Sequence, residues 1–285
     1  MRNRKLSFLA WLCMFALLIS ALGSFALAAE ASVEVGCKEI PLYMNWEYIG
    51  VGYLIGDTTF VPVRSFCETM LGTDIIASWD QEDESVTLDA VGLHITINQG
   101  DAYFTANDRC LYIPDGVYNV NGTLLMPLRP LAKMFNATVY WNSYSRSIDI
   151  DTYNLKILES GKYFYDDDTL YWLSRVISSE AGFEPFIGQI AVGNVVLNRV
   201  NDTSGSFPDT VKDVVFQSGQ FQVVSAGTIY NEPLDEAVAA AKLCLEGYEV
   251  VGNSLFFLNP SISSNYWFRV NRTYVTTIQG HEFYA

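Results

Sequence analysis

The sequence predicts an α+β protein with two differently built parts behind a short apolar leader. Two observations predict this fold class. A strand–helix–strand pattern occurs twice before residue 151, and helical segments dominate from residue 169 onward. The length of 285 residues allows two domains, and the 50% hydrophobic content excludes an extensively disordered chain. We expect a signal peptide at 1–28, a repeat module at 32–151, a linker at 152–168 and a second domain at 169–285.

The leader has the features of a secretory signal. Arg2, Arg4 and Lys5 precede a long apolar run that ends in A-L-A at residues 26–28. A basic start, an apolar middle and small residues before a cleavage point are typical of an exported protein, cut here after Ala28 or Ala29. The apolar run is also long enough to span a bilayer, so an uncleaved membrane anchor is the alternative.

The charge of the chain limits its partners. The formal net charge is −15, and loss of the three leader cations would take it to −18. So acidic a body repels nucleic acid and anionic membrane surfaces. We therefore expect no nucleic-acid partner, and membrane contact only if the leader is retained.

Cysteine and histidine are too few and too scattered for a metal site. The chain has five cysteines with no CxxC pair, and its two histidines are His94 and His281. We expect no metal and no cofactor. Export permits disulfides among the four cysteines after the leader, but their spacing does not define a pairing. Cys244, within "AVAAAKLCLEG", is typical of an inert cysteine on a buried helix face.

An internal repeat occupies the first part. "TTFVPVRSFCETMLGTDIIASWDQEDESVTLDA" from Thr58 and "GTLLMPLRPLAKMFNATVYWNSYSRSIDID" from Gly122 share one order of elements. A strand runs into Pro-x-Arg, a short helix follows, and then come a strand with a tryptophan, a turn and a last alternating strand. Such repetition indicates a duplicated supersecondary unit. Arg64 and Arg129 at the equivalent positions could bind a carboxylate, although pairing within each repeat is the simpler role.

This repeat resembles the domain at the N-terminus of some copper amine oxidases, which is also found in exported bacterial proteins. The resemblance covers about residues 33–150. Since there is no histidine cluster here, neither copper nor oxidase chemistry is expected. The resemblance implies a module that binds or spaces.

The second part begins with an acidic run, "YDDD", that favours a helix start. "TLYWLSRVISSE" then carries apolar residues at helical spacing, Gly182 can end this helix, and Pro185 can open the next one. "PFIGQIAVGNVVLNRV" is apolar nearly all round and predicts a buried helix. "FPDTVKDVVFQSGQF" predicts a loop with a short helix, "NEPLDEAVAAAKLCLEG" a capped helix, and "NSLFFLNP" and "RTYVTTIQGHEFY" strands.

Glu180 stands at the C-terminal end of the first of these helices. The peptide dipoles present partial negative charge there, which disfavours an anion. If the side chain is partly buried, its proton is held more tightly, as a general acid near neutral pH requires. Glu184, four residues later, is expected either at the start of the next helix or in contact with a substrate.

Residues 170–284 resemble the catalytic domain of spore cortex-lytic cell wall hydrolases. The matching blocks are E-A at residues 180–181, "GQIAVGNVVLNRV", "FPDTVKDVVFQSGQF", "NSLFFLNP" and "NRTYVTTIQGHEFY". The resemblance implies a lysozyme-like, mainly helical α+β catalytic domain at 169–285 that cuts the glycan strands of peptidoglycan. It implies that Glu180 is the catalytic acid of a lytic transglycosylase cutting the MurNAc-GlcNAc bond. Gly182-Phe183 departs from the Arg-Gly of many relatives, which affects the details of the subsites.

Further residues are candidate substrate contacts, each with a structural role as the alternative. They are Glu184, Gln189, Asn198, Phe221, Phe257 and Asn259. His281 is expected to be structural. Two other functions stay open at this point: hydrolysis with water as the nucleophile, and an inactive wall-binding scaffold. We expect a secreted monomer in the cell wall or spore envelope, with peptidoglycan glycan strands as its partner.

Overall fold

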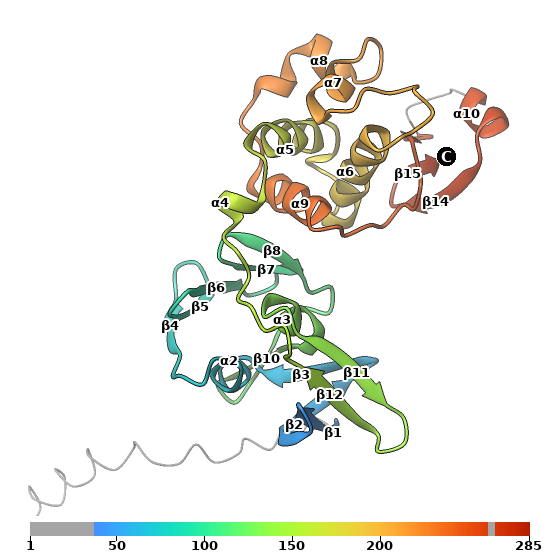
Figure 1. Ribbon diagram of the computed structural model, residues 1–285. Helices are drawn as coiled ribbons and strands as arrows, with labels where there is room; N and C mark the ends of the chain where they lie inside the picture. Colours follow the sequence, from blue (N-terminus) through green and yellow to red (C-terminus); the bar gives the residue numbers. More distant parts are fainter. Residues whose placement is uncertain (1–36, 262–265) are drawn as a thin grey trace, which may run out of the picture.

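The computed structural model describes residues 37–261 and 266–285 (Figure 1). The expected signal peptide at 1–28 lies outside the described residues. Among the helices that are described, none combines the length and the apolar character that a bilayer crossing requires. The structure is of the mixed α+β class, with a sheet-rich first part and a mainly helical second part, as predicted.

The first part contains a seven-stranded sheet in the order β11-β12-β1-β2-β3-β10-β9. Its strands are β1 (Lys38–Met44), β2 (Glu47–Ile55), β3 (Thr58–Pro62), β9 (Tyr118–Val120), β10 (Thr123–Pro127), β11 (Thr138–Asn142) and β12 (Ser147–Asp151). Paired strands in this sheet are antiparallel, except that β1 and β12 run parallel. Because β12 is the last strand of the second repeat, its pairing with β1 at the start of the module closes the first part around one core.

A second sheet of five antiparallel strands has the order β4-β5-β6-β7-β8. Its strands are β4 (Ile76–Asp80), β5 (Ser85–Ala90), β6 (Leu93–Asn98), β7 (Tyr103–Ala106) and β8 (Arg109–Tyr112). The short helices α2 (Val63–Leu71) and α3 (Leu128–Met134) follow the equivalent prolines, Pro62 and Pro127, which are their N-cap residues. The predicted duplication is therefore confirmed, but the closing strands of the two copies enter different sheets.

The second part is built from helices and one small sheet. Its helices are α4 (Gly161–Phe164), α5 (Asp167–Ala181), α6 (Phe186–Val200), α7 (Val211–Phe216), α8 (Gln222–Ala226), the 3₁₀ helix η1 (Thr228–Tyr230), α9 (Asp235–Leu245) and α10 (Tyr266–Asn271). Its strands are β13 (Phe256–Leu258), β14 (Tyr274–Ile278) and β15 (His281–Tyr284), in the antiparallel order β13-β15-β14.

The crossing of α5, α6 and α9 forms the core of the second part. Asp166 caps α5 by accepting a hydrogen bond of 2.8 Å from the Thr169 backbone amide, so the acidic run starts this helix as expected. A Cβ at Gly193 of α6 would come within 2.7 Å of the Cys244 sulfur and 2.8 Å of the Ile177 Cδ1. Gly193 is therefore required for the close approach of the three helices. The Cys244 thiol is buried among them, which raises its pKa, and the predicted position on a buried helix face is confirmed, whereas its inertness stays a prediction.

The two parts meet at β8, the linker and the C-terminal end of α9. Arg109 of β8 donates two hydrogen bonds to the carboxylate of Glu246, at 2.6 and 2.7 Å, and Tyr165 donates a third at 3.0 Å. The Arg109 guanidinium also stacks on the ring of Phe164, 3.3 Å from its centroid. Cys110 packs within the core of the helical part rather than that of the sheets. The predicted linker, 152–168, thus contributes to a packed junction between the two parts.

Candidate active site

Glu180 lies in the last turn of α5, which ends at Ala181 with Gly182 as its C-cap residue. Its side chain is half-buried, and this burial raises the pKa of Glu180 above its ordinary value. Two groups act in the opposite direction: the positive charge of Arg199 first, and then a hydrogen bond from the backbone amide of Val223. The carboxyl group therefore holds its proton more tightly than an exposed glutamate does. Once it is deprotonated, Arg199 and the Val223 amide stabilise the carboxylate.

Arg199 supplies the positive charge from the last turn of α6. It is 4% exposed, and burial lowers its pKa to about 10, with Glu180 acting against the shift, so it stays cationic at neutral pH. Its Nε donates to the Leu255 carbonyl at 2.8 Å. In the part of the chain that the structure describes, its Nη1 is buried without a hydrogen-bond partner. An unpaired buried donor beside a carboxyl group is available to a ligand that enters the site.

Three aromatic rings surround the guanidinium of Arg199. Phe207, Phe221 and Phe256 have ring centroids 5.0, 5.1 and 5.6 Å from its Cζ. Such rings stabilise a cation by their quadrupoles and exclude water from it. Phe221, a predicted substrate contact, is 6% exposed and is the N-cap residue of α8, so its ring contributes to the wall around Arg199.

The segment 223–234, which includes Val223, is hydrogen-bonded to the last turn of α5. The Ser179 hydroxyl donates to the Thr228 carbonyl at 3.2 Å, and the Ser178 hydroxyl accepts from the Leu234 amide at 3.1 Å. Gly227 ends α8 in the left-handed conformation, with φ of 77°. These contacts place the start of α8 against Glu180, although more than 40 residues separate them in the sequence.

Glu184 lies between the two helices, directly before Pro185, the N-cap residue of α6. Its backbone amide donates to the Ala181 carbonyl at 2.9 Å, which closes the turn after α5. Its carboxylate lies 3.6 Å from Nδ1 of His281, whose side chain is 12% exposed. Glu184 is not among the groups that shift the pKa of Glu180. The expected position near the start of the second helix is observed, and a direct role in substrate binding stays a prediction.

Gln189 and Asn198 of α6 have partners within the protein. The Gln189 amide donates to the Glu184 carbonyl at 3.2 Å and to the Glu236 carboxylate at 2.8 Å. The Asn198 amide donates to the carbonyls of Gly252 and Ser254 at 2.7 and 3.0 Å. These bonds tie α6 to α9 and to the loop before β13. Substrate contacts by either residue stay predictions.

The last two candidates lie on or beside the small sheet. Phe257 of β13 is half-buried, and its ring contacts those of His281 and Phe283, at centroid distances of 5.8 and 6.1 Å. Asn259 follows β13 and accepts a hydrogen bond of 3.0 Å from the Ser261 amide. Neither residue shares a contact with Glu180 in the structure as described, so their roles toward a substrate stay predictions.

Two residues near Glu180 were not selected from the sequence. Arg199 lies on the helix that the sequence predicts to be apolar nearly all round, and the presence of a cation on such a helix is the signal that could have identified it. Phe183, three residues after Glu180 in the sequence, is fully exposed. Among the described residues, no group of three or more His, Cys, Asp or Glu side chains could hold a metal ion.

Comparison with known proteins identifies both parts of the chain. Residues 183–284 match the family model of cell wall hydrolases, and residues 45–150 match that of the copper amine oxidase N-terminal domain. The spore cortex-lytic enzyme of Bacillus cereus is 36% identical over 103 residues, which are 36% of this chain and 39% of that protein. The enzyme of the same name from Oceanobacillus iheyensis is 37% identical over 103 residues, 36% of this chain and 37% of that protein.

A solved structure also matches the second part. The catalytic domain of the germination-specific lytic transglycosylase SleB from Bacillus anthracis is 32% identical; the match covers 45% of this chain and 100% of that one, with a TM-score of 0.40. This chain spans about two fifths of the length of the curated relatives above. The cell wall hydrolase match begins three residues after Glu180, so the selection of Glu180 depends on the E-A block and on its surroundings. The chain thus carries a cell wall hydrolase domain at 183–284, preceded by a copper amine oxidase N-terminal domain at 45–150.

Proposed function

We propose that this chain is an exported enzyme that cleaves the glycan strands of peptidoglycan as a lytic transglycosylase, with Glu180 as its acid and base. The observation that carries the proposal is the position of Glu180: it is partly buried at a helix C-terminus, its pKa is raised, and the charge of the buried Arg199 acts on it. The matches to the cell wall hydrolase family and to spore cortex-lytic enzymes support peptidoglycan as the substrate.

One carboxyl group can serve both halves of this reaction. Protonated Glu180 donates its proton to the glycosidic oxygen as the bond from the anomeric carbon of MurNAc breaks. The resulting carboxylate is stabilised by the charge of Arg199 and by the Val223 amide. It then accepts the proton of the muramic C6 hydroxyl as that oxygen attacks the anomeric carbon. The products are a new GlcNAc end and a 1,6-anhydro-MurNAc end, Glu180 is protonated again, and no water is consumed.

A hydrolytic mechanism would need a base for water, usually a second carboxylate. Glu184 is the nearest in sequence, but its carboxylate faces His281 from the small sheet. This placement favours the single-carboxylate mechanism. Hydrolysis and an inactive wall-binding scaffold are the two alternatives that the experiment separates.

The experiment compares the full chain with its Glu180→Gln and Glu184→Gln variants on purified vegetative and cortex peptidoglycan. New glycan ends are identified by mass spectrometry. We expect 1,6-anhydro ends from the unmodified chain, and a loss of about 10²–10⁴-fold or more in Glu180→Gln, because the amide keeps the shape but transfers no proton. Glu184→Gln should lose far less activity than Glu180→Gln, because in this mechanism Glu184 transfers no proton, and its own loss measures the predicted contact of Glu184 with the substrate.

Other results would contradict specific parts of the proposal. Reducing MurNAc ends would show that water is the nucleophile. Unchanged turnover in Glu180→Gln would exclude Glu180 as the acid. No cleavage of either wall by the unmodified chain would favour the scaffold. The vegetative and cortex preparations, used side by side, show which wall is cut, and immunolocalisation of the chain tests its proposed place in the wall or spore envelope.

A further inference from the structure

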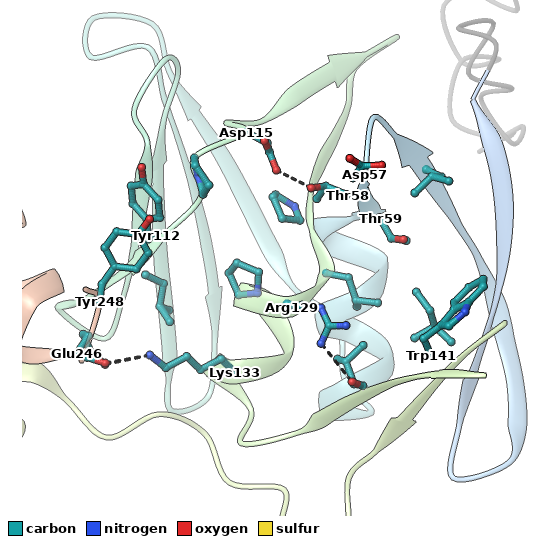
Figure 2. A pocket seen from close by; sticks show the side chains of 18 of the residues that line it. Asp57, Thr58, Thr59, Tyr112, Asp115, Arg129, Lys133, Trp141, Glu246 and Tyr248 are labelled. Carbon is teal, nitrogen blue, oxygen red and sulfur yellow. Dashed lines mark hydrogen bonds and ion pairs between the residues drawn. The ribbon is translucent and has the colours of Figure 1, made fainter. Parts of the chain in front are cut away.

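A cavity of about 750 Å³ lies where the repeat module meets the end of α9, and Glu180 does not line it (Figure 2). The strands β3, β10, β11 and β12 and the helix α3 contribute to its walls, together with residues 243 and 246–248 of the helical part. Its volume is in the range of sites that hold a small molecule or a short peptide. Nothing in the function proposed above uses this cavity.

The two copies of the repeat differ in a way that concerns this cavity. In the first copy, Arg64 of α2 donates to the Glu68 carboxylate one turn later, at 2.8 Å. In the second copy, the residue equivalent to Glu68 is Lys133, one turn after Arg129. An acid–base pair in one copy is thus replaced by two cations in the other. Like charges at this helical spacing are unfavourable, so the second copy carries a local electrostatic cost.

Both cations line the cavity; Arg129 has no carboxylate partner there, and Lys133 shares the Glu246 carboxylate with Arg109 and donates to the Glu246 carbonyl at 3.4 Å. The Arg129 guanidinium donates to the Val139 carbonyl at 3.3 Å and forms no ion pair with any described residue. The Lys133 ammonium is 3.7 Å from the Glu246 carboxylate, but that carboxylate is already bound by both nitrogens of Arg109. Figure 2 shows Arg129 and Lys133 on the same wall. In a chain with a net charge of −15, this pair of cations is a local positive site that would attract an anion.

The rest of the cavity limits what kind of anion fits. Asp57 and Asp115 stand together across the cavity from the two cations (Figure 2), and Asp115 accepts a hydrogen bond of 2.6 Å from Thr58. Apart from Lys38 and Glu246, the rest of the lining is largely apolar and includes Leu54, Leu128, Val139, Ile148 and Trp141. A polyanion such as a phosphate polymer would be repelled by the two aspartates. A peptide with carboxylates and an amino group would match both ends.

We propose that this cavity binds the peptide stems of peptidoglycan, with Arg129 and Lys133 binding stem carboxylates and Asp57 and Asp115 facing the amino group of the diamino acid. Stem peptides combine free carboxylates, small apolar side chains and a basic side chain, and the cavity has groups that could contact each of the three. The identity of the peptide rests on the proposed function, whereas the carboxylate-binding position rests on the charges described above. The cavity would hold a peptide while the glycan to which it is attached reaches the catalytic domain.

Isothermal titration calorimetry of the full chain with the synthetic tripeptide L-Ala-γ-D-Glu-L-Lys tests this inference. We expect saturable binding that weakens about tenfold or more when both peptide carboxylates are amidated, since a charge-assisted pair is lost. Arg129→Gln should cause a similar loss. The matched control is Arg64→Gln, the equivalent position of the first repeat, which should change the affinity less than about twofold because Arg64 does not line the cavity. Circular dichroism melting curves establish that both variants are folded.

Each alternative result is decisive. No binding of the tripeptide, or equal losses in Arg64→Gln and Arg129→Gln, would overturn the inference. Binding of inorganic tripolyphosphate without binding of the tripeptide would overturn it in favour of a phosphate-bearing polymer. The assay contains no glycan, so it is independent of catalysis. A chain that cleaves glycan but does not bind the tripeptide contradicts this inference alone, and a chain that binds it but does not cleave contradicts the proposed function alone.

Discussion

Replacing Glu246 by glutamine is expected to destabilise the junction between the two parts. The Glu246 side chain is 2% exposed and receives both nitrogens of Arg109, whose side chain is 10% exposed. At an effective dielectric constant of about 20, two unit charges at this separation attract by about 6 kcal/mol before the cost of removing them from water. Glu246→Gln keeps the shape and leaves the Arg109 guanidinium buried without its counter-charge.

The expected loss is about 3 kcal/mol, because breaking a buried ion pair on one side costs about 3–5 kcal/mol and the amide can still accept one hydrogen bond. The chain offers a matched control in Glu232→Gln. Glu232 pairs with Arg175 at 3.0 Å, but its side chain is 88% exposed, so solvent screens the pair and its removal should have little effect.

Urea unfolding of the two variants and the unmodified chain measures these differences. Tryptophan fluorescence reports both parts, since Trp79 and Trp141 lie in the sheets and Trp172 in the helical core. A loss below about 1 kcal/mol in Glu246→Gln, or one no larger than that in Glu232→Gln, would refute the reasoning.

The same contacts predict that residues 153–285 alone, which lack Arg109 and Cys110, are less stable than they are within the full chain.

Three further predictions concern the proposed acid. Because the folded pKa of Glu180 is raised, the stability it contributes is present below its ordinary pKa of 4.5 and is lost as pH rises through the folded value. Glu180→Gln should therefore unfold at a higher temperature than the unmodified chain at pH 7, and an equal or lower midpoint would contradict this. Arg199→Leu should raise the pKa of Glu180 further and move the alkaline limb of the pH–rate profile to higher pH. Arg199→Lys, which keeps the charge, should move that limb less. No shift of the limb in Arg199→Leu would exclude a direct effect of the Arg199 charge on Glu180. Gly182→Ala should destabilise the fold by about 1–3 kcal/mol in denaturant unfolding, because a Cβ there would clash with the Ser178 carbonyl oxygen. An unchanged midpoint would show that the turn relaxes freely.

Local signals predicted much of the second part. The acidic run before α5 has the capping role inferred for it, Gly182 ends that helix, and the apolar segment after Pro185 forms the buried α6. These features depend on residues within a few positions of one another, and this is the range over which capping and periodicity act. The location of Glu180 at a helix C-terminus follows from the same local rules.

Contacts between distant segments could not be predicted in this way. Arg109 and Glu246 are 137 residues apart, and neither has a neighbouring residue type that indicates the other. The two copies of the repeat have similar sequences, yet β4 and β11 enter different sheets because β11 pairs with β12, which in turn pairs with β1. Strand pairing of this kind depends on the whole fold rather than on the strand sequence.

The position of Glu180 follows from local sequence signals, whereas its pKa depends on contacts between distant segments. The sequence places the carboxyl group at the end of α5, but the groups that set its pKa come from α6 and from the start of α8. In the proposed mechanism, burial alone would favour the acid form and hinder the later carboxylate, whereas strong ion pairing alone would remove the proton too early. Arg199 and the Val223 amide act against the effect of burial without overcoming it, since the pKa remains raised. A single residue that must both donate and recover a proton needs this balance, and the balance exists only once three distant segments have folded together.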